Sequence, residues 1–295
     1  MISSKRKIKN WLLRHPNFNP YTFSINSTYR TFTSSFRMLP NFIVLGFPNC
    51  GTASFYSYIL QHPNMGLPVK KSIHFFNTEY ERGLDWYKAQ FPTIQHKNNF
   101  EKTKKENFIV GEDSPRSILF FSASKRMKKV LPKILLFVLL RNPIDRAYSS
   151  YQKNKNLGIE KLTFEELINE DEKRAENWLN LVNKNQITRY NITSIPKPYL
   201  SFGKYSYYLE HWFKDFPEEQ FCFIKTSELG INIKDTMNEA FEFLHIPQFE
   251  IKNVEKKHVR KYEPMKTKTR DLLIDFFKPY NTNLEKLLNI KFDWN

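Results

Sequence analysis

The chain has 295 residues, of which 40% are hydrophobic and 16% aromatic. This content of large apolar groups excludes a disordered protein, and the length allows one large α/β domain or at most two smaller ones. The net charge of +16 favours anionic partners such as nucleotides, nucleic acid, acidic polysaccharide or a membrane surface, and does not choose among them.

Targeting signals and disulfide patterns are weak in this sequence. The two cysteines, Cys50 and Cys222, make no disulfide framework. The longest apolar run, residues 134–140, is far shorter than the roughly 20 residues of a membrane span. The basic start, residues 1–7, precedes an apolar patch that is too short for a signal peptide. We therefore expect a cytoplasmic protein without a transmembrane segment, whose basic N-terminus makes weak contact with a membrane surface at most.

The first half of the chain alternates between predicted strands and helices. Residues 1–38 are polar and weakly periodic, which predicts an extension before a domain over residues 39–295. The apolar run at residues 41–46 predicts a strand that is buried on both faces. A helix is expected over residues 52–61, and a second short strand over residues 108–111.

The middle of the chain contains the strongest predicted strand. A helix with a basic face is expected over residues 117–130. The strand over residues 134–140 follows and ends at Arg141. Pro143 suits the first turn of the next helix, because a proline there loses no helical hydrogen bond.

Helices dominate the second half. Thr163 and Glu166 form a capping box before a helix over residues 163–178. The remaining predicted elements are helices over residues 203–216, 234–244 and 268–288 and a strand over residues 221–225. Strands separated by helices predict an α/β fold with a central, mostly parallel sheet that is flanked by helices. In such sheets ligands bind at the carboxyl ends of the strands.

The turn between the first strand and the first helix, residues 46–54, can hold an anion. Gly46 and Gly51 let the backbone curl so that several N–H groups point inward, and the following helix adds its dipole. Thr52 and Ser54 add hydroxyl donors. Thr52 and Ala53 stand where a Walker A loop has its lysine and hydroxyl residue, which disfavours a kinase that uses Mg-ATP. The alternative is an ordinary turn whose glycines serve packing.

A second turn follows the strongest strand. Arg141 stands at the carboxyl end of that strand, where a guanidinium can make a bidentate contact with a phosphate. Ser149 lies two helical turns further on and can reach the same anion. A structural salt bridge is the alternative for Arg141. For Asp145 and Arg146 we favour solvated or ion-paired positions on the helix.

These turns and further segments, in order over roughly residues 40–292, resemble the sulfotransferase family, in the branch of the heparan sulfate sulfotransferases and their prokaryotic relatives. The further matching segments are residues 71–76, 83–92, 111–115, 203–216 and 260–265. The resemblance implies a P-loop-like three-layer domain. It also implies that the donor is PAPS (3′-phosphoadenosine 5′-phosphosulfate) and that no metal is required.

The resemblance also assigns residues to the nucleotide donor. It implies that the first turn holds the 5′-phosphosulfate and that Arg141 and Ser149 hold the 3′-phosphate. A late basic loop would close over the nucleotide. The expected nucleotide-binding residues are Asn49, Cys50, Gly51, Thr52, Ala53, Ser54, Arg141, Ser149, Arg260, Lys261 and Tyr262.

Three positions depart from the family pattern. Asn49 replaces the loop lysine, Ser72 replaces a glutamate that serves as the base in several relatives, and Asp113 replaces a lysine. We therefore expect the catalytic residues to be Asn49, with His74 or Glu112 as the base. Lys70 or Lys71 can supply the missing positive charge.

The sequence therefore predicts an enzyme that transfers a sulfonate group from PAPS to a hydroxyl or amine acceptor, such as a carbohydrate or glycolipid. A catalytically degenerate relative that binds PAPS or its product PAP (adenosine 3′,5′-bisphosphate) is the alternative. The densest basic stretch, residues 252–270, coincides with the loop that the resemblance expects to close over the nucleotide. Nucleotide binding therefore explains this stretch, and no specific nucleic-acid partner is expected. We expect the acceptor contacts within residues 152–202.

Overall fold

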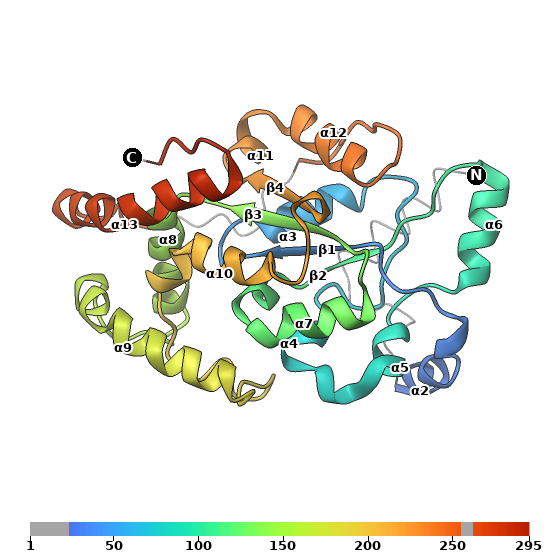
Figure 1. Cartoon of the computed structure of the whole chain (residues 1–295), viewed down its shortest axis with the longest axis horizontal. Helices are drawn as coiled ribbons and strands as arrows, with labels where there is room; N and C mark the ends of the chain where they lie inside the picture. The colour runs from blue at the N-terminus through green and yellow to red at the C-terminus, as the bar shows by residue number, and fades with distance from the viewer. Residues whose placement is uncertain (1–23, 255–261, 295) are drawn as a thin grey trace.

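The computed structural model describes residues 24–254 and 262–294. The basic N-terminal residues 1–7 and the expected nucleotide contacts Arg260 and Lys261 lie outside this described part. Within these described residues, four strands form one sheet in the order β2-β1-β3-β4, and every pairing is parallel (Figure 1). The strands are β1 (Phe42–Gly46), β2 (Gly111–Asp113), β3 (Leu135–Leu140) and β4 (Phe221–Lys225). The predicted α/β fold with a parallel sheet is thereby confirmed.

Three of the four strand predictions agree with the structure to within one residue, and the prediction for residues 108–111 is wrong. The strand there begins at Gly111, the last residue of the predicted range. Gly111 fits because a Cβ atom at this position would lie only 2.4 Å from the Phe42 ring. The polar pair Glu112 and Asp113 then continues the strand although both residues are buried.

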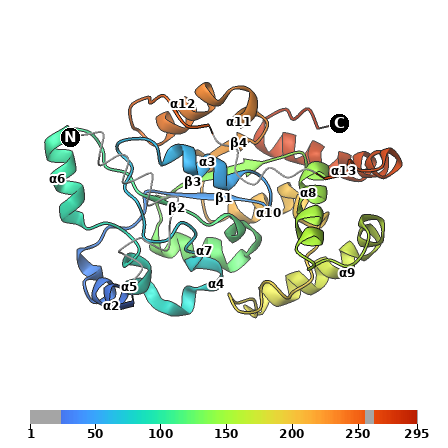
Figure 2. The same ribbon diagram turned by 180° about the vertical axis from the view of Figure 1, so that it is seen from behind.

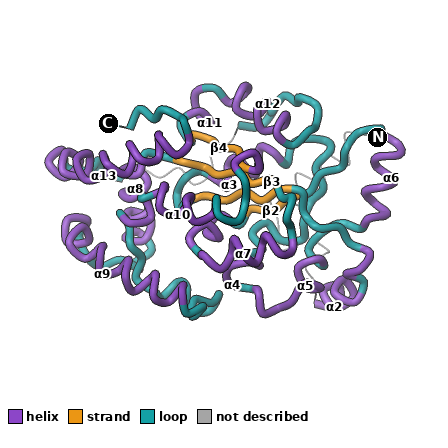
Figure 3. The backbone as a smooth tube through the Cα atoms, viewed as in Figure 1, coloured by secondary structure: helices purple, strands orange, loops and turns teal. Residues whose placement is uncertain are grey.

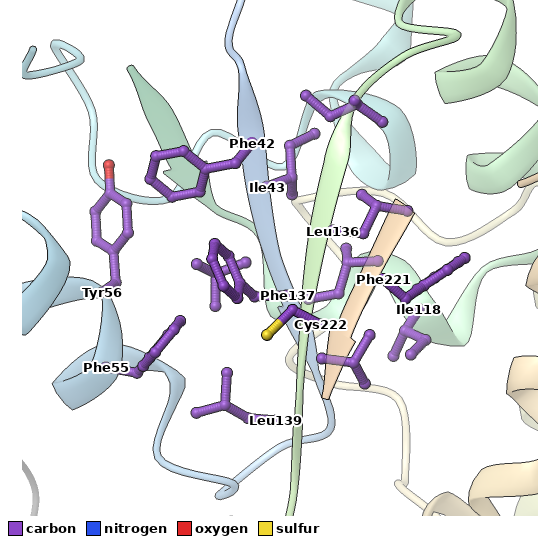
Figure 4. Close-up of a cluster of buried hydrophobic side chains, with 14 of the residues drawn as sticks. Phe42, Ile43, Phe55, Tyr56, Ile118, Leu136, Phe137, Leu139, Phe221 and Cys222 are labelled. Atoms are coloured by element: carbon purple, nitrogen blue, oxygen red, sulfur yellow. The ribbon is translucent and has the colours of Figure 1, made fainter. Parts of the chain in front are cut away.

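Helices cover both faces of the sheet, as Figures 1 and 2 show. On one face lie α3 (Thr52–Ile59) and α12 (Ile233–Phe243), whose Phe55 and Phe243 rings pack 5.0 and 5.2 Å from the Phe137 ring of β3. On the other face lie the 3₁₀ helix η4 (Pro115–Leu119), α7 (Phe121–Val130) and α10 (Tyr205–Trp212). In Figure 4, Phe55 and Ile118 lie on opposite sides of the strands. These two apolar layers form the main core.

The other helices extend from this three-layer centre, as Figure 3 shows. They are α2 (Ser24–Phe32), α4 (Phe75–Thr78), α5 (Gly83–Lys88), α6 (Ile94–Lys104), α8 (Pro143–Asn156), α9 (Phe164–Asn183), α11 (Glu228–Ile231) and α13 (Thr267–Leu288). Pro143 occupies the first turn of α8, and the capping box of Thr163 and Glu166 opens α9, as predicted. Within the described ranges, no helix combines the length and the apolar character needed to cross a bilayer.

The predicted helix over residues 203–216 is interrupted. Residues 201–203 form a 3₁₀ turn, and α10 begins only at Tyr205. Gly203 allows close packing at this turn, since a Cβ atom there would lie 2.8 Å from the Phe277 ring and 2.9 Å from Pro143. The predicted helix over residues 117–130 is likewise divided into η4 and α7.

The residues before β1 dock onto the domain. The buried Arg30 of α2 donates hydrogen bonds to the carbonyls of Ala89 (2.6 Å) and Phe91 (2.8 Å). Arg37 donates to the same Phe91 carbonyl at 3.1 Å. The domain boundary between residues 38 and 39 stays a prediction.

Candidate functional site

A cavity of about 1040 Å³ opens at the carboxyl edge of the sheet. The parallel register places the last residues of all four strands along this edge. Nine of the residues expected to bind the nucleotide or take part in catalysis line the cavity: Asn49, Gly51, Thr52, Ala53, Ser54, His74, Arg141, Ser149 and Tyr262. The structure therefore brings together segments that are far apart in the sequence.

The turn from β1 to α3 forms one wall of the cavity. Gly51 has φ +81° and directly precedes α3, whose N-terminal turn carries Thr52 and Ser54 into the lining. A side chain at Gly51 would be strained by the positive φ, and its Cβ atom would also lie only 3.1 Å from the Thr226 methyl group. The Thr226 hydroxyl also lies 2.7 Å from the Cys50 carbonyl oxygen. The end of β4 thus supports the turn from behind and fixes its left-handed geometry.

Arg141 and Ser149 meet at Asn49. The Asn49 side-chain amide donates to the Ser149 hydroxyl at 3.3 Å, and Arg141 donates to the Asn49 carbonyl at 3.1 Å. Asn49 has φ +69°, a conformation that asparagine tolerates better than most residues. The Tyr205 hydroxyl donates to the Arg141 carbonyl at 2.8 Å and so holds the end of β3. A guanidinium, a hydroxyl and an amide therefore converge beside the turn from β1 to α3, residues 46–54, which we call the glycine turn.

Cys50, expected as a nucleotide contact, does not line the cavity. Its thiol is completely buried and lies 3.8 Å from the Tyr205 hydroxyl. Burial raises the pKa of the Cys50 thiol, so it stays protonated at neutral pH. The side chain packs in the core, and only the backbone of Cys50 belongs to the turn.

The expectation that Arg146 is solvated or ion-paired on the helix is wrong. Its side chain is fully buried and is not solvated, and it donates to the Tyr199 carbonyl. Within the described ranges its Nε and Nη1 atoms have no hydrogen-bond partner. The reason is its place on the face of α8 that turns toward the core. Asp145 is ion-paired as expected, with Arg270 at 2.5 Å.

The segment after the first helix brings a lysine to the cavity. The Lys71 Nζ lies 3.4 Å from the Ala53 carbonyl oxygen of the first turn and 3.8 Å from Asp113 Oδ2. Lys71, Ser72 and Asp113 all line the cavity. The negative charge of Asp113 is therefore offset by an ammonium that also reaches the turn.

His74 lines the cavity as a neutral ring. Its backbone N–H donates to the Ser114 hydroxyl at 3.0 Å, and its Nε2 atom lies 3.5 Å from the Arg116 guanidinium. Burial, and then the positive charge of Arg116, lower the pKa of His74 to about 3. The imidazole is therefore uncharged at neutral pH and can accept a hydrogen bond, and it is a weak base in this state.

Glu112 lies beneath the cavity and is not part of its lining. Its carboxylate accepts hydrogen bonds from the Tyr87 hydroxyl at 2.7 Å and the Ser114 hydroxyl at 2.6 Å. Complete burial raises the pKa of Glu112 to about 7. Because Ser114 in turn accepts the His74 N–H, Glu112 supports the loop that carries His74. The structure gives no direct route from this carboxylate to a ligand, and its role as a base stays a prediction.

Several lining residues were missed from the sequence. Arg116, Lys153, Lys197 and Thr226 also line the cavity. Arg116 follows directly after the matched segment 111–115, so its position in the sequence was a usable signal. The sequence held a weaker signal for Thr226, which directly follows the predicted strand over residues 221–225. Lys153 and Lys197 fall within the stretch expected to contact the acceptor.

Two comparisons with known sequences agree with each other. Residues 39–274 match the family model described as "Sulfotransferase domain". The chain is 26% identical to the mouse (Mus musculus) bifunctional heparan sulfate N-deacetylase/N-sulfotransferase 4 over 85% of its length. It is 25% identical to carbohydrate sulfotransferase 15 of Rattus norvegicus over 86% of its length. The alignments cover only 30% and 54% of these two relatives.

A solved structure has the same fold. The sulfotransferase of Alicyclobacillus acidocaldarius superposes with a TM-score of 0.64 at 24% sequence identity. The match covers 86% of this chain and 98% of that protein.

Proposed function

Because the chain belongs to the sulfotransferase domain family, as the match over residues 39–274 shows, we propose that it transfers a sulfonate group from PAPS to a hydroxyl or amine acceptor. The observation that carries this proposal is the convergence of Arg141, Asn49 and Ser149 beside the glycine turn. Two turns that follow separate strands bring hydroxyls, an amide and a guanidinium to one cavity, which suits a donor with two separate anionic groups.

We assign the two anionic groups of PAPS to two neighbouring parts of the cavity. In the proposal the turn with Gly51, Thr52 and Ser54 holds the 5′-phosphosulfate, and Arg141 and Ser149 hold the 3′-phosphate. Tyr262 also lines the cavity, and its ring lies 5.6 Å from that of Tyr148 on α8. Within the described part of the chain, no group of three or more His, Cys, Asp or Glu residues is placed to hold a metal. That the reaction needs no metal stays a prediction.

The transfer requires a positive charge where negative charge develops. A bond forms between the acceptor oxygen or nitrogen and sulfur, the bond from sulfur to the 5′-phosphate oxygen breaks, and the acceptor loses a proton. Negative charge therefore grows on the departing phosphate. Lys71 is our candidate to stabilise it, because its ammonium lies against the Ala53 carbonyl of the turn. The Asn49 amide is directed to Ser149 instead.

His74 is our candidate to accept the proton. Its ring is neutral, lines the cavity and lies beside Arg116, and Ser114 holds its backbone N–H. The anionic donor would raise the basicity of the ring, since nearby negative charge favours the protonated imidazole. For the acceptor we propose a carbohydrate or glycolipid. Its support is the resemblance to relatives named as heparan sulfate and carbohydrate sulfotransferases.

The donor site can be tested by calorimetric titration with PAP, using 5′-AMP to measure the contribution of the 3′-phosphate. We expect wild-type protein to bind PAP much more tightly than 5′-AMP. Arg141→Ala should weaken PAP binding by about 10- to 150-fold, because a charge-assisted hydrogen bond contributes about 1.5–3 kcal/mol. Arg82→Ala is the matched control, since Arg82 pairs with Glu79 and does not line the cavity.

Unchanged PAP affinity in a folded Arg141→Ala variant would contradict the assignment of the 3′-phosphate site. Transfer from radiolabelled PAPS then separates the two functional alternatives. Turnover supports the enzyme, whereas PAP binding without turnover on a broad panel of hydroxyl and amine acceptors supports the non-catalytic relative.

A further inference from the structure

Three aromatic side chains project into solvent from the segment before β1. Tyr29 and Phe32 belong to α2, and Phe36 belongs to the 3₁₀ helix η2 (Ser34–Phe36) that follows it. These residues are 63, 88 and 68% exposed. Their spacings of three and four residues are those of one helical face. A group of exposed rings on one face marks an interaction site, because water covers such a surface at a cost in free energy.

Two exposed aliphatic residues adjoin the three rings. They are Leu84 of α5 and Ile94 of α6. The Ser34 hydroxyl of η2 donates at 2.6 Å to Asp85, the residue after Leu84. An isolated antiparallel bridge joins the residue after Phe36 to the residue before Ile94. We call these five residues the apolar patch: Tyr29, Phe32, Phe36, Leu84 and Ile94.

The helix that carries the rings presents no exposed charge. The charged residues of the segment 24–38 are Arg30 and Arg37, and both are buried. Both donate to the Phe91 carbonyl, at 2.8 and 3.1 Å. The arginines therefore fasten α2 to the domain from behind, and the outer face shows aromatic rings among the hydroxyls of serine and threonine.

The charge of the adjoining segments indicates which partner covers the patch. Residues 1–23 lead directly into α2, and their sequence contains five Lys or Arg and no Asp or Glu. Residues 94–106, which begin in the patch, add four lysines against two glutamates. Residues 79–88, around Leu84, hold three acidic and two basic residues and offset little of this surplus. A second copy of the chain would bring like charges together, whereas an anionic lipid surface attracts them.

The apolar patch lies away from the proposed donor site. Residues 24–38 lead into the amino end of β1, whereas the cavity opens where the strands end. Figures 1 and 2 both show α2, α5 and α6 at one end of the molecule and α8 and α13 at the other. None of the five patch residues lines the cavity. A partner on the patch therefore leaves the cavity open to water.

From these observations we propose that the apolar patch docks the protein onto an anionic lipid bilayer. The rings of Tyr29, Phe32 and Phe36 enter the interface between headgroups and acyl chains, where aromatic side chains are favoured. The basic residues before α2 contact the acidic headgroups. Residues 1–7 alone were expected to make at most a weak contact, and stable anchoring takes an apolar and a basic component together. The inference is independent of the proposed sulfonate transfer.

The test is co-sedimentation of the full chain with vesicles of phosphatidylcholine, alone or mixed with phosphatidylserine. The proteins are wild type, the double variant Phe32→Ser/Phe36→Ser, and the triple variant Lys5→Gln/Lys7→Gln/Lys9→Gln. The matched control is Tyr207→Ser/Leu272→Ser. Tyr207 and Leu272 are exposed on α10 and α13 and belong neither to the patch nor to the cavity lining.

We expect wild type and the control to bind the phosphatidylserine vesicles at least about tenfold more tightly than Phe32→Ser/Phe36→Ser does, because each ring loses its burial in the interface. The triple lysine variant should also bind more weakly, and added salt should weaken the binding of wild type. Calorimetric PAP binding is measured on every variant. It should not change, since the altered residues lie outside the cavity lining.

Three results overturn the docking surface: no binding of wild type to phosphatidylserine vesicles, equal binding to both kinds of vesicle, or undiminished binding of Phe32→Ser/Phe36→Ser. A dimer of wild type in light scattering that this double variant loses also overturns it, because a second copy then covers the patch. If the double variant fails to fold, undiminished binding of Phe32→Ser alone is decisive against the proposal. All these results leave the proposed function standing, whereas failure of wild type to bind PAP contradicts that function and not the docking surface.

Discussion

At the scale of single residues, the positive charge of this site lies on a different segment than the family pattern predicts. Asn49 occupies the position of the loop lysine, but its amide donates to Ser149. Lys71 reaches the same turn from the segment after α3 and pairs with Asp113. One ammonium group therefore joins the turn that carries Asn49 to Asp113, through the Ala53 carbonyl.

We predict that Lys71→Gln lowers kcat for sulfonate transfer by about 100- to 1000-fold, because removal of a preorganised charge-stabilising group costs roughly 2.7–4 kcal/mol. PAP affinity should change much less. Lys70→Gln is the control, since the Lys70 ammonium lies over the Trp86 ring, 5.2 Å from its centre. The measurement is steady-state transfer from PAPS to the acceptor that supports wild-type turnover.

The Lys71 hypothesis also predicts a rescue. Asn49→Lys in the Lys71→Gln background should recover part of the lost rate, because it returns an ammonium to the turn. The left-handed conformation at residue 49 costs a lysine about 1 kcal/mol, so the stability of the double variant should be measured as well. Full activity of Lys71→Gln alone would rule out this role for Lys71.

The buried Glu112 makes stability depend on pH. Burial raises its pKa from 4.5 to about 7 in the folded protein, so the folded state binds the proton more tightly than the unfolded state. Its contribution to the unfolding free energy is therefore fully present below pH 4.5 and is lost as pH rises through about 7. We predict that Glu112→Gln flattens this decline.

The slope of the unfolding free energy against pH can be measured by urea unfolding between pH 5 and 8. Glu219→Gln, at an exposed position, should keep the wild-type slope. A Glu112→Gln variant with the same pH dependence as wild type would show that Glu112 titrates normally.

Sequence patterns predicted the site residues in the turns that follow β1 and β3, and missed those that follow β2 and β4. Gly51, Arg141 and Ser149 could be placed because the carboxyl ends of parallel strands share one edge. Arg146 and Cys50 could not, because the direction of a side chain on a helix or turn depends on packing that the local sequence does not encode. Arg116 had a signal in the sequence, its place directly after the matched segment 111–115, but its contact with His74 comes from packing that the local sequence does not encode.

At the scale of elements, the strands that are continuous apolar runs were predicted well, and the shortest helices and the polar strand were not. β1, β3 and β4 are apolar runs whose type and limits follow from burial on both faces. The short helices α4, α5 and α11 have too few turns to show a periodic pattern, and tertiary contacts hold them. β2 was misplaced because its polar residues are stabilised by Tyr87 and Lys71 from other segments and by the adjacent Ser114.

The capping box of α9 should contribute measurably to the stability of the protein. The Thr163 hydroxyl accepts the Glu166 N–H at 3.3 Å, and the Glu166 carboxylate accepts the Thr163 N–H at 2.7 Å. Thr163→Ala should lower the unfolding free energy by about 1 kcal/mol. Thr282→Ala, inside α13 and exposed, should be neutral or slightly stabilising, because alanine favours the helix interior. Equal urea midpoints for the two variants would contradict a stabilising cap.

At the scale of the whole molecule, two apolar clusters hold the chain together. The larger one surrounds the sheet, and a second one joins α8, α9 and α13 through Ile144, Phe164 and Phe277. The cavity lies where the elements of both clusters meet, since its lining includes residues of α3 and of α8. The relative position of Asn49 and Ser149 therefore depends on both clusters.

The attachment of α2 to the domain through Arg30 should also contribute to stability. Arg30→Ala removes the donor from two carbonyls, at Ala89 and Phe91, and should lower the unfolding free energy by about 1.5–3 kcal/mol. Phe32→Ala is the control on the same helix, since Phe32 is 88% exposed and should change stability by less than about 0.5 kcal/mol. Denaturant unfolding measures both, and equal values would show that residues 24–38 contribute little to the fold.

The strand order has a consequence for biosynthesis. Each neighbouring pair in the sheet joins segments that are distant in sequence, so no pairing can form as a local hairpin, and such topologies fold slowly. The glycine turn emerges early from the ribosome, yet it is supported by Thr226 at the end of the last strand. A nascent chain therefore has no complete cavity at this edge until most of its length has been translated, and a ligand of the proposed donor site cannot assist the early steps of its folding.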